Sequence, residues 1–147
     1  MKLDWFELTE NPIESHQIEG AQSLINVRFP ASYRAVLANH HDSYGDADFA
    51  IHGSLHRASI GHWLSLSPWE TDSIWSYVST WQEHQLPHNV VPFATDGAGN
   101  CICFDYRSSP EPAVVMWYHE LSGADGLITV APTFDIFLEL LCAPAET

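Results

Sequence analysis

The stretch 89–120 holds three short apolar segments that are separated by turn-forming residues. The segments are Val90–Ala94, Cys101–Tyr106 and Ala113–Tyr118. Each has the length of a β-strand, is rich in β-branched or aromatic residues, and is bounded by Gly, Pro, Asn or Asp. The sequence Asp-Gly-Ala-Gly-Asn at 96–100 suits a turn, because Gly reaches positive φ at low cost and Asp bonds to its own backbone. The stretch therefore predicts an antiparallel meander at the centre of one sheet.

Two helices are predicted before this meander. The first starts at a cap on Asn11, because a Pro follows the cap directly and a Glu three residues after it completes a capping box. It should end near Asn26, because Phe29 precedes Pro30 and is disfavoured in a helix. The second starts at Pro30 or Ala31 and ends in the turn-forming run 41–46. One side of the second helix should face the core, with Tyr33, Val36, Leu37 and His40.

Similar signals predict two later helices. The sequence Ser-Pro-Trp-Glu at 67–70 repeats the cap pattern, and a wide apolar stripe follows as far as Trp81. A final helix over 133–141 is capped by its Thr. Further short strands are expected at 48–52, 62–66 and 127–130. Together these elements predict an α+β fold in a single domain, residues 1–147, with a central antiparallel β-sheet meander flanked by helices.

The charge of the chain is strongly negative. Nineteen acidic residues stand against five basic ones, which gives a formal charge of −14. Such a surface repels nucleic acid and anionic lipid and attracts basic partners, so we expect neither nucleic acid nor membrane as a partner. No apolar run approaches the roughly 20 residues of a membrane span, and the N-terminus lacks the apolar run of a signal peptide. With three cysteines and no Cys-x-x-Cys pair, we expect a cytoplasmic protein with reduced thiols.

Few residues suggest catalysis or metal binding. Cys103 and His119 could meet across neighbouring strands as a nucleophile and its base. His52, His56 and His62 form the best metal-binding cluster, although the glycines near them disfavour the helix that would align the first two. The loop 96–100 lacks the alternating acids of a calcium loop. We therefore expect no catalytic residue, metal or cofactor, and keep a small Cys/His-dependent hydrolase or metal protein as an alternative.

The candidate partner-binding residues are acidic or aromatic and lie in two short stretches, one after the second helix and one at the start of the third. They are Asp42, Tyr44, Asp46, Asp48, Trp69 and Glu70. The first stretch is expected to be a loop, where functional residues are often found. An aromatic anchor ringed by acids would suit a basic protein partner. The alternatives are an ordinary solvated loop and a Trp that packs over the edge of the sheet.

Four segments, in this order, resemble the signatures of one family. The sequence at 29–37, Phe-Pro-Ala-Ser-Tyr-Arg-Ala-Val-Leu, resembles the Leu-Pro-x-x-Tyr-x-x-Phe-Leu signature of the Smi/Knr-like group of the SUKH superfamily. Val-Pro-Phe-Ala-Thr-Asp-Gly-Ala-Gly-Asn at 91–100 is similar to its Ile-Pro-Phe-x-x-Asp-Gly-x-Gly-Asp segment. The strand that ends in Trp-Tyr-His-Glu at 117–120 resembles its Trp-x-His-Glu strand, and 131–138 resembles its closing helix.

This resemblance implies a small α+β domain without recognised catalytic residues. In bacteria, members of the group are mostly immunity proteins, which bind and neutralise a cognate secreted toxin that is often a nuclease. We therefore expect a non-catalytic immunity protein, monomeric or homodimeric, whose partner is a cognate and basic toxin protein. The alternative is a regulatory protein-interaction domain of the same fold with a different cellular partner, as eukaryotic relatives in cell-wall assembly suggest.

Overall fold

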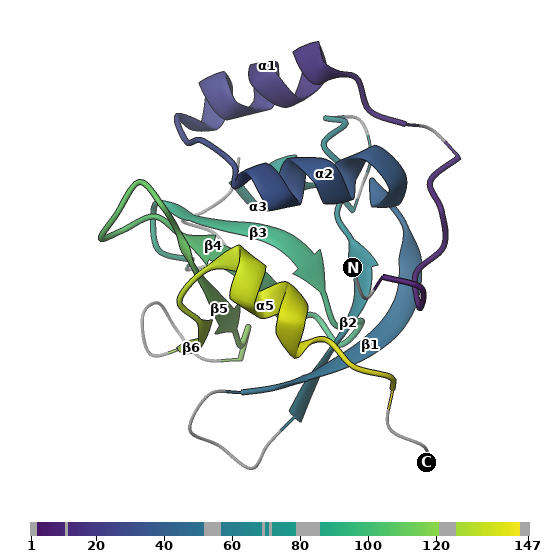
Figure 1. The fold of residues 1–147 in the computed structure, drawn as a ribbon. Coiled ribbons are helices and arrows are strands. Elements are labelled where there is room, and N and C mark those ends of the chain that lie inside the picture. Colours follow the sequence, from purple (N-terminus) through teal and green to yellow (C-terminus); the bar gives the residue numbers. More distant parts are fainter. Residues whose placement is uncertain are drawn as a thin grey trace.

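The computed structural model contains one six-stranded antiparallel sheet in which the strands follow their order in the chain (Figure 1). The structure describes residues 3–10, 12–51, 57–68, 70, 72–78, 86–120 and 126–144. The strands are β1 (Tyr44–Ala50), β2 (Arg57–Trp63), β3 (Val90–Thr95), β4 (Cys101–Asp105), β5 (Ala113–Trp117) and β6 (Leu127–Ala131). The predicted meander is confirmed as β3, β4 and β5, and the strand predicted near the C-terminus is confirmed as β6.

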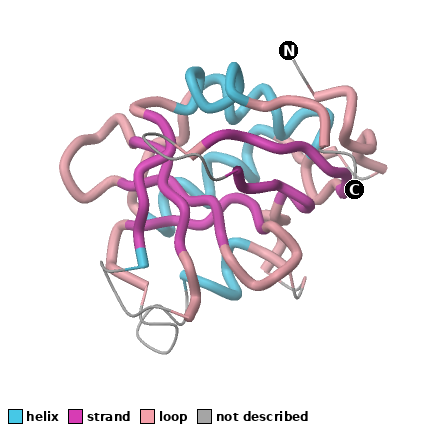
Figure 2. Tube along the Cα trace, turned by 90° about the horizontal axis from the view of Figure 1, so that it is seen from below, coloured by secondary structure: helices cyan, strands magenta, loops and turns pink. Residues whose placement is uncertain are grey.

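The helices are α1 (Ser15–Ile25), α2 (Ala31–His40), α3 (Ile74–Val78) and α5 (Phe134–Leu140). Helices α2 and α5 cover one face of the sheet, while α1 lies outside α2, away from the strands (Figure 1). Strands β1 and β2 extend beyond the rest of the sheet (Figure 1), and only His62 and Trp63 of β2 pair with β3. Figure 2 shows the same sheet from below. The α+β fold with an antiparallel sheet and flanking helices is thus confirmed. No helix in these described ranges is long and apolar enough to cross a membrane.

A cluster of four buried aromatic rings joins the two covering helices to the meander. Tyr33 of α2 lies 4.9 Å from Phe104 of β4 and 5.6 Å from Phe134 of α5, measured between ring centroids. Phe93 of β3 lies 4.3 Å from Phe104 and 5.4 Å from Phe134. Each such pair contributes about 0.5–1.5 kcal/mol beyond the burial of its surface. We call these four residues the aromatic cluster.

The helix predictions were correct for α2 and α5 but wrong for the starts of the other two. Helix α1 begins at Ser15, where Glu14 caps it and forms a capping box with Gln17; Asn11, the predicted cap, lies outside the described residues. Helix α3 begins at Ile74 rather than after Ser67. The reason is tertiary, because the chain turns back after Leu66 so that Asp72–Ile74 can pair with the backbone of Ser65.

The predicted limits of β1 and β2 were also wrong. Strand β1 begins at Tyr44 instead of residue 48, and β2 covers 57–63 instead of 62–66. Their mutual pairing sets these limits, because Tyr44 faces His62 at one end of the pair and Ala50 faces Arg57 at the other. The stretch that was predicted as a loop after α2 is therefore largely a strand.

The predicted turn at 96–100 and the predicted cap at Thr133 are confirmed. The Asp96 carboxylate accepts hydrogen bonds from the backbone N–H groups of Ala98 (2.8 Å) and Asn100 (3.2 Å). Gly97 and Gly99 both have positive φ, at 85° and 95°, a conformation that glycine adopts at low cost. Thr133 caps α5 by accepting a hydrogen bond from the backbone N–H of Ile136.

The hydroxyl group of Tyr33 generates a stability prediction. Tyr33 is fully buried and its hydroxyl has no hydrogen-bond partner among the described residues. An unpaired buried polar group costs free energy, so Tyr33→Phe should leave the free energy of unfolding unchanged or raise it by about 1 kcal/mol. Tyr33→Ala should lower it by about 3–5 kcal/mol, because the ring is lost. Urea unfolding of both variants measures this, and a clear loss of stability in Tyr33→Phe would contradict it.

Candidate partner-binding site

An exposed tyrosine at the start of β1 is held in place by its neighbours. Tyr44 is 52% exposed, and its ring stacks on the imidazole of His62 at 4.1 Å with an interplanar angle of 11°. His62 is buried, and its Nε2 lies 2.7 Å from Oδ1 of Asp42. The backbone carbonyl of Tyr44 also accepts a hydrogen bond from Glu7 (2.8 Å). Tyr44 therefore presents an aromatic surface whose orientation is largely fixed.

Three carboxylates lie near enough to act electrostatically on the hydroxyl group of Tyr44. Partial burial raises the pKa of Tyr44, and the negative charges of Asp72, Asp42 and Glu70 raise it further. The phenol therefore stays neutral, and the three acids give its surroundings a negative potential. We call Asp42, Tyr44, His62, Glu70 and Asp72 the Tyr44 patch.

The Tyr44 patch unites three of the six residues that the sequence suggested. Asp42, Tyr44 and Glu70 come from separate stretches and meet here, because the chain after β2 turns back beside the start of β1. Sequence reasoning missed Asp72 and the contribution of His62. A correct register for β1 and β2 would have revealed His62, since it is the direct cross-strand neighbour of Tyr44.

The other suggested residues lie elsewhere. Asp46 is exposed on β1, and its backbone N–H is bonded to the carbonyl of Trp5. Asp48 is half-buried, exchanges backbone hydrogen bonds with Cys142, and has a carboxylate oxygen 4.0 Å from Nε of Arg57. That position ties Asp48 to the C-terminal segment instead of the Tyr44 patch. Trp69 lies outside the described residues.

The residues considered for catalysis have surroundings that suppress nucleophilic chemistry. Cys101 and Cys103 point to the same side of β4, as predicted, into a small buried cluster that also contains Val115 and Trp117. Burial raises the pKa of Cys101 to about 12 and that of Cys103 well above its ordinary value. A reactive thiol needs the opposite shift. Nδ1 of His119 lies 2.9 Å from the side-chain oxygen of Asn100.

The metal-binding alternative concerned three histidines. His62 is engaged by Asp42, and His52 and His56 lie outside the described residues. Within the part of the chain that the structure describes, no group of three or more His, Cys, Asp or Glu side chains is arranged to hold a metal ion.

A comparison with known protein families assigns the chain to one of them. The SMI1 / KNR4 family (SUKH-1) matches residues 12–140, a range that includes every helix and strand of the described residues. The chain belongs to this family. Membership in SUKH-1 implies that the protein acts through a protein partner. Among curated proteins, none matches this chain.

Gly45 fixes the N-terminal segment of this SUKH-1 protein against the Tyr44 patch. A Cβ atom at Gly45 would lie 2.3 Å from the carbonyl oxygen of Trp5 and 2.7 Å from Cα of Phe6. Because these neighbours are backbone atoms, Gly45→Ala should cost about 1–3 kcal/mol of stability through overpacking.

Thermal unfolding measures the effect of Gly45→Ala. Gly20→Ala is the control, since Gly20 has open space around it and Ala should stabilise the helix by about 0.5–1 kcal/mol. Equal effects at both sites would contradict this packing.

The buried thiols lead to a prediction about reactivity. In the folded protein near pH 8, iodoacetamide should modify the half-buried Cys142 and leave Cys101 and Cys103 unmodified, because alkylation requires an accessible thiolate. In denaturant all three should react. Peptide mass spectrometry reports which thiols carry the label. Rapid labelling of Cys103 in the folded protein would restore the hydrolase alternative.

Proposed function

We propose that this protein is a non-catalytic immunity protein that binds and neutralises a cognate, basic toxin through the Tyr44 patch. Membership in SUKH-1 supports the class of function. The observation that carries the choice of surface is the exposed ring of Tyr44, which stacks on His62 and lies in the negative field of Asp42, Glu70 and Asp72.

The physical case for this surface begins with pre-organisation. Exposed aromatic side chains are frequent hot spots of protein interfaces, and a side chain that is already ordered loses less entropy on binding. The stack on His62, together with the contact between His62 and Asp42, supplies that order for Tyr44. A partner can therefore bury the outer face of this ring without first fixing its rotamer.

Charge is the second part of the case. The three carboxylates near Tyr44 act within an overall charge of −14, and a negative field of this kind accelerates encounter with a positively charged partner. A nuclease toxin that binds phosphates would carry such positive charge. Salt screens the attraction, so association should slow as ionic strength rises.

The test uses the product of the adjacent open reading frame as the binding partner. Binding kinetics of the wild-type protein should show a one-to-one complex whose association rate falls with salt. Tyr44→Ala should weaken binding by about tenfold or more, as expected for a hot-spot residue, whereas Tyr44→Phe should retain most of the affinity because its ring still stacks on His62.

Charge variants separate steering from contact. The double change Glu70→Gln and Asp72→Asn should slow association and reduce its salt dependence. Glu111→Gln is the matched control for Glu70→Gln alone, because each change removes one exposed acid. Glu111 precedes β5, at the end of the meander where Asp105 pairs with Ala113, whereas His62 of the Tyr44 patch pairs with Thr95 at the other end.

Three outcomes would count against the proposal. A complex that tolerates Tyr44→Ala and both charge changes would move the interface to another surface. A complex that forms but leaves the partner's toxicity intact would favour a regulatory interaction domain. No complex with a well-folded protein would reject immunity to that partner.

A further inference from the structure

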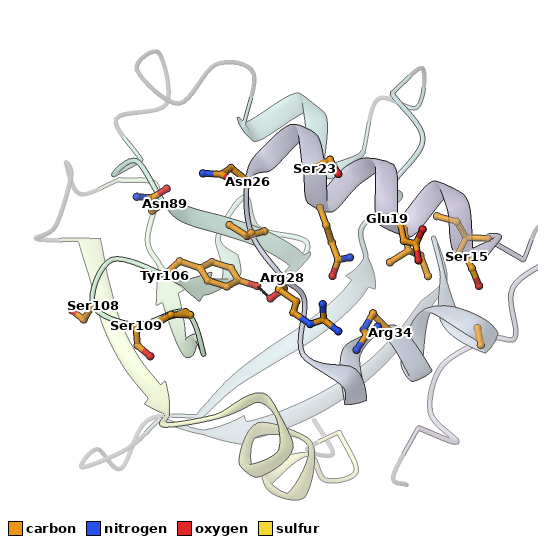
Figure 3. A pocket seen from close by; sticks show the side chains of 16 residues that line it. Ser15, Glu19, Ser23, Asn26, Arg28, Arg34, Asn89, Tyr106, Ser108 and Ser109 are labelled. Carbon is orange, nitrogen blue, oxygen red and sulfur yellow. Dashed lines mark hydrogen bonds between the residues drawn. The ribbon is translucent and has the colours of Figure 1, made fainter.

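A groove on the other side of α2 has a different character from the Tyr44 patch. It has a volume of about 1090 Å³ and lies between α1, α2 and the loop that follows β4 (Figure 3). Arg28 and Arg34 line it, and Figure 3 shows both guanidinium groups directed into the same part of the groove. These are two of only five basic residues in a chain with nineteen acids.

The two arginines differ from the other described arginines in having no acidic partner. Arg107 is bonded to Asp105 through two nitrogens, at 2.9 and 3.0 Å, and Nε of Arg57 lies 4.0 Å from Asp48. Neither Arg28 nor Arg34 has a described carboxylate within 4.0 Å. Nε of Arg34 is buried, yet it has no hydrogen-bond partner among the described residues. A partly buried guanidinium group without a counter-charge is costly, and an anion in the groove would supply that charge.

The backbone near Arg28 is held firmly. Its carbonyl accepts a hydrogen bond from the hydroxyl of Tyr106 at 2.8 Å, and the next backbone N–H, of Phe29, donates to the side chain of Gln22 at 2.8 Å. Arg34 follows Tyr33 of the aromatic cluster on α2, so its backbone is equally fixed. The charges are thus presented from a rigid base.

Acids at the edges of the site limit what it can accept. Glu19 also lines the groove, and Glu111 and Asp135 line an adjoining hollow of about 450 Å³ that shares both arginines. These carboxylates would repel an extended polyanion such as nucleic acid, as would the overall charge of −14. A single compact oxyanion between the two guanidinium groups avoids most of this repulsion.

We infer that this groove binds a small molecule through a phosphate or carboxylate group, with Arg28 and Arg34 as its principal ligands. The fork of donors on each guanidinium matches both oxyanions in a bidentate geometry. This inference does not depend on the proposed toxin partner.

Occupation of the groove should restrain α1. This helix buries only Ala21 and Ile25, and its Leu24 is 77% exposed, so few contacts hold it to the rest of the protein. An anion bound to Arg34 of α2 and to the segment after α1 would link the two. Amide hydrogen exchange in residues 15–25 should therefore slow when the ligand is bound.

The test titrates the protein with inorganic phosphate and, separately, with succinate, at constant ionic strength set with sodium chloride. Nuclear magnetic resonance should show saturable shifts at Arg28 and Arg34 for at least one of the two anions. Arg28→Gln and Arg34→Gln should each raise the dissociation constant about tenfold or more, as expected for loss of a bidentate ion pair. Arg57→Gln removes the same charge from a distant arginine and should leave the constant unchanged.

The results distinguish a phosphate ligand, a carboxylate ligand and the absence of an anion site. Saturation by phosphate alone assigns a phosphate ester, and saturation by succinate alone assigns a carboxylate. If Arg34→Gln unfolds, Arg28→Gln still decides, because Arg28 is exposed at the surface. The inference is overturned if neither anion saturates, or if Arg57→Gln weakens binding as much as the groove variants do.

Discussion

The packing of Tyr33 against Phe93, Phe104 and Phe134 is the contact on which the rest of the structure depends, because it fixes α2 against the sheet. Helix α2 then positions both surfaces of interest. At its C-terminal end, the ring nitrogen of His40 donates to the carbonyl of Glu7, and His41 accepts a hydrogen bond from the backbone of Leu66. These bonds hold the segments that frame the Tyr44 patch. Near its N-terminal end, the same helix directs Arg34 into the groove.

The parts of the fold that follow from local signals could be predicted from the sequence. The strands of the meander, the core side of α2 and the cap of α5 depend on residues within a few positions of one another. The starts of β1 and α3 could not be predicted in this way. They depend on pairing between distant residues, Tyr44 with His62 and Ser65 with Ser73, and such pairing overrides local helix and turn preferences.

The candidate site shows the same division. Acidic and aromatic character singled out Asp42, Tyr44 and Glu70, but their convergence on one ring required the register of β1 with β2 and the return of the chain after Leu66. The two groove arginines could not be predicted from the sequence, because they share no motif and meet only where the segment after α1 lies beside α2. Their scarcity is visible in the sequence, but only the structure shows that neither Arg28 nor Arg34 has a described carboxylate within 4.0 Å.

The two surfaces are of opposite charge and are joined by a rigid element, so they should act independently. Coupling between sites requires an element with two arrangements that both ligands influence. Helix α2 does not provide one, because its core side is completely buried and its C-terminal end is bonded to two other segments. Helix α1 is the loosely held element, but it lines only the groove and does not contribute to the Tyr44 patch. An anion in the groove would therefore order α1 without altering the aromatic and acidic surface at Tyr44.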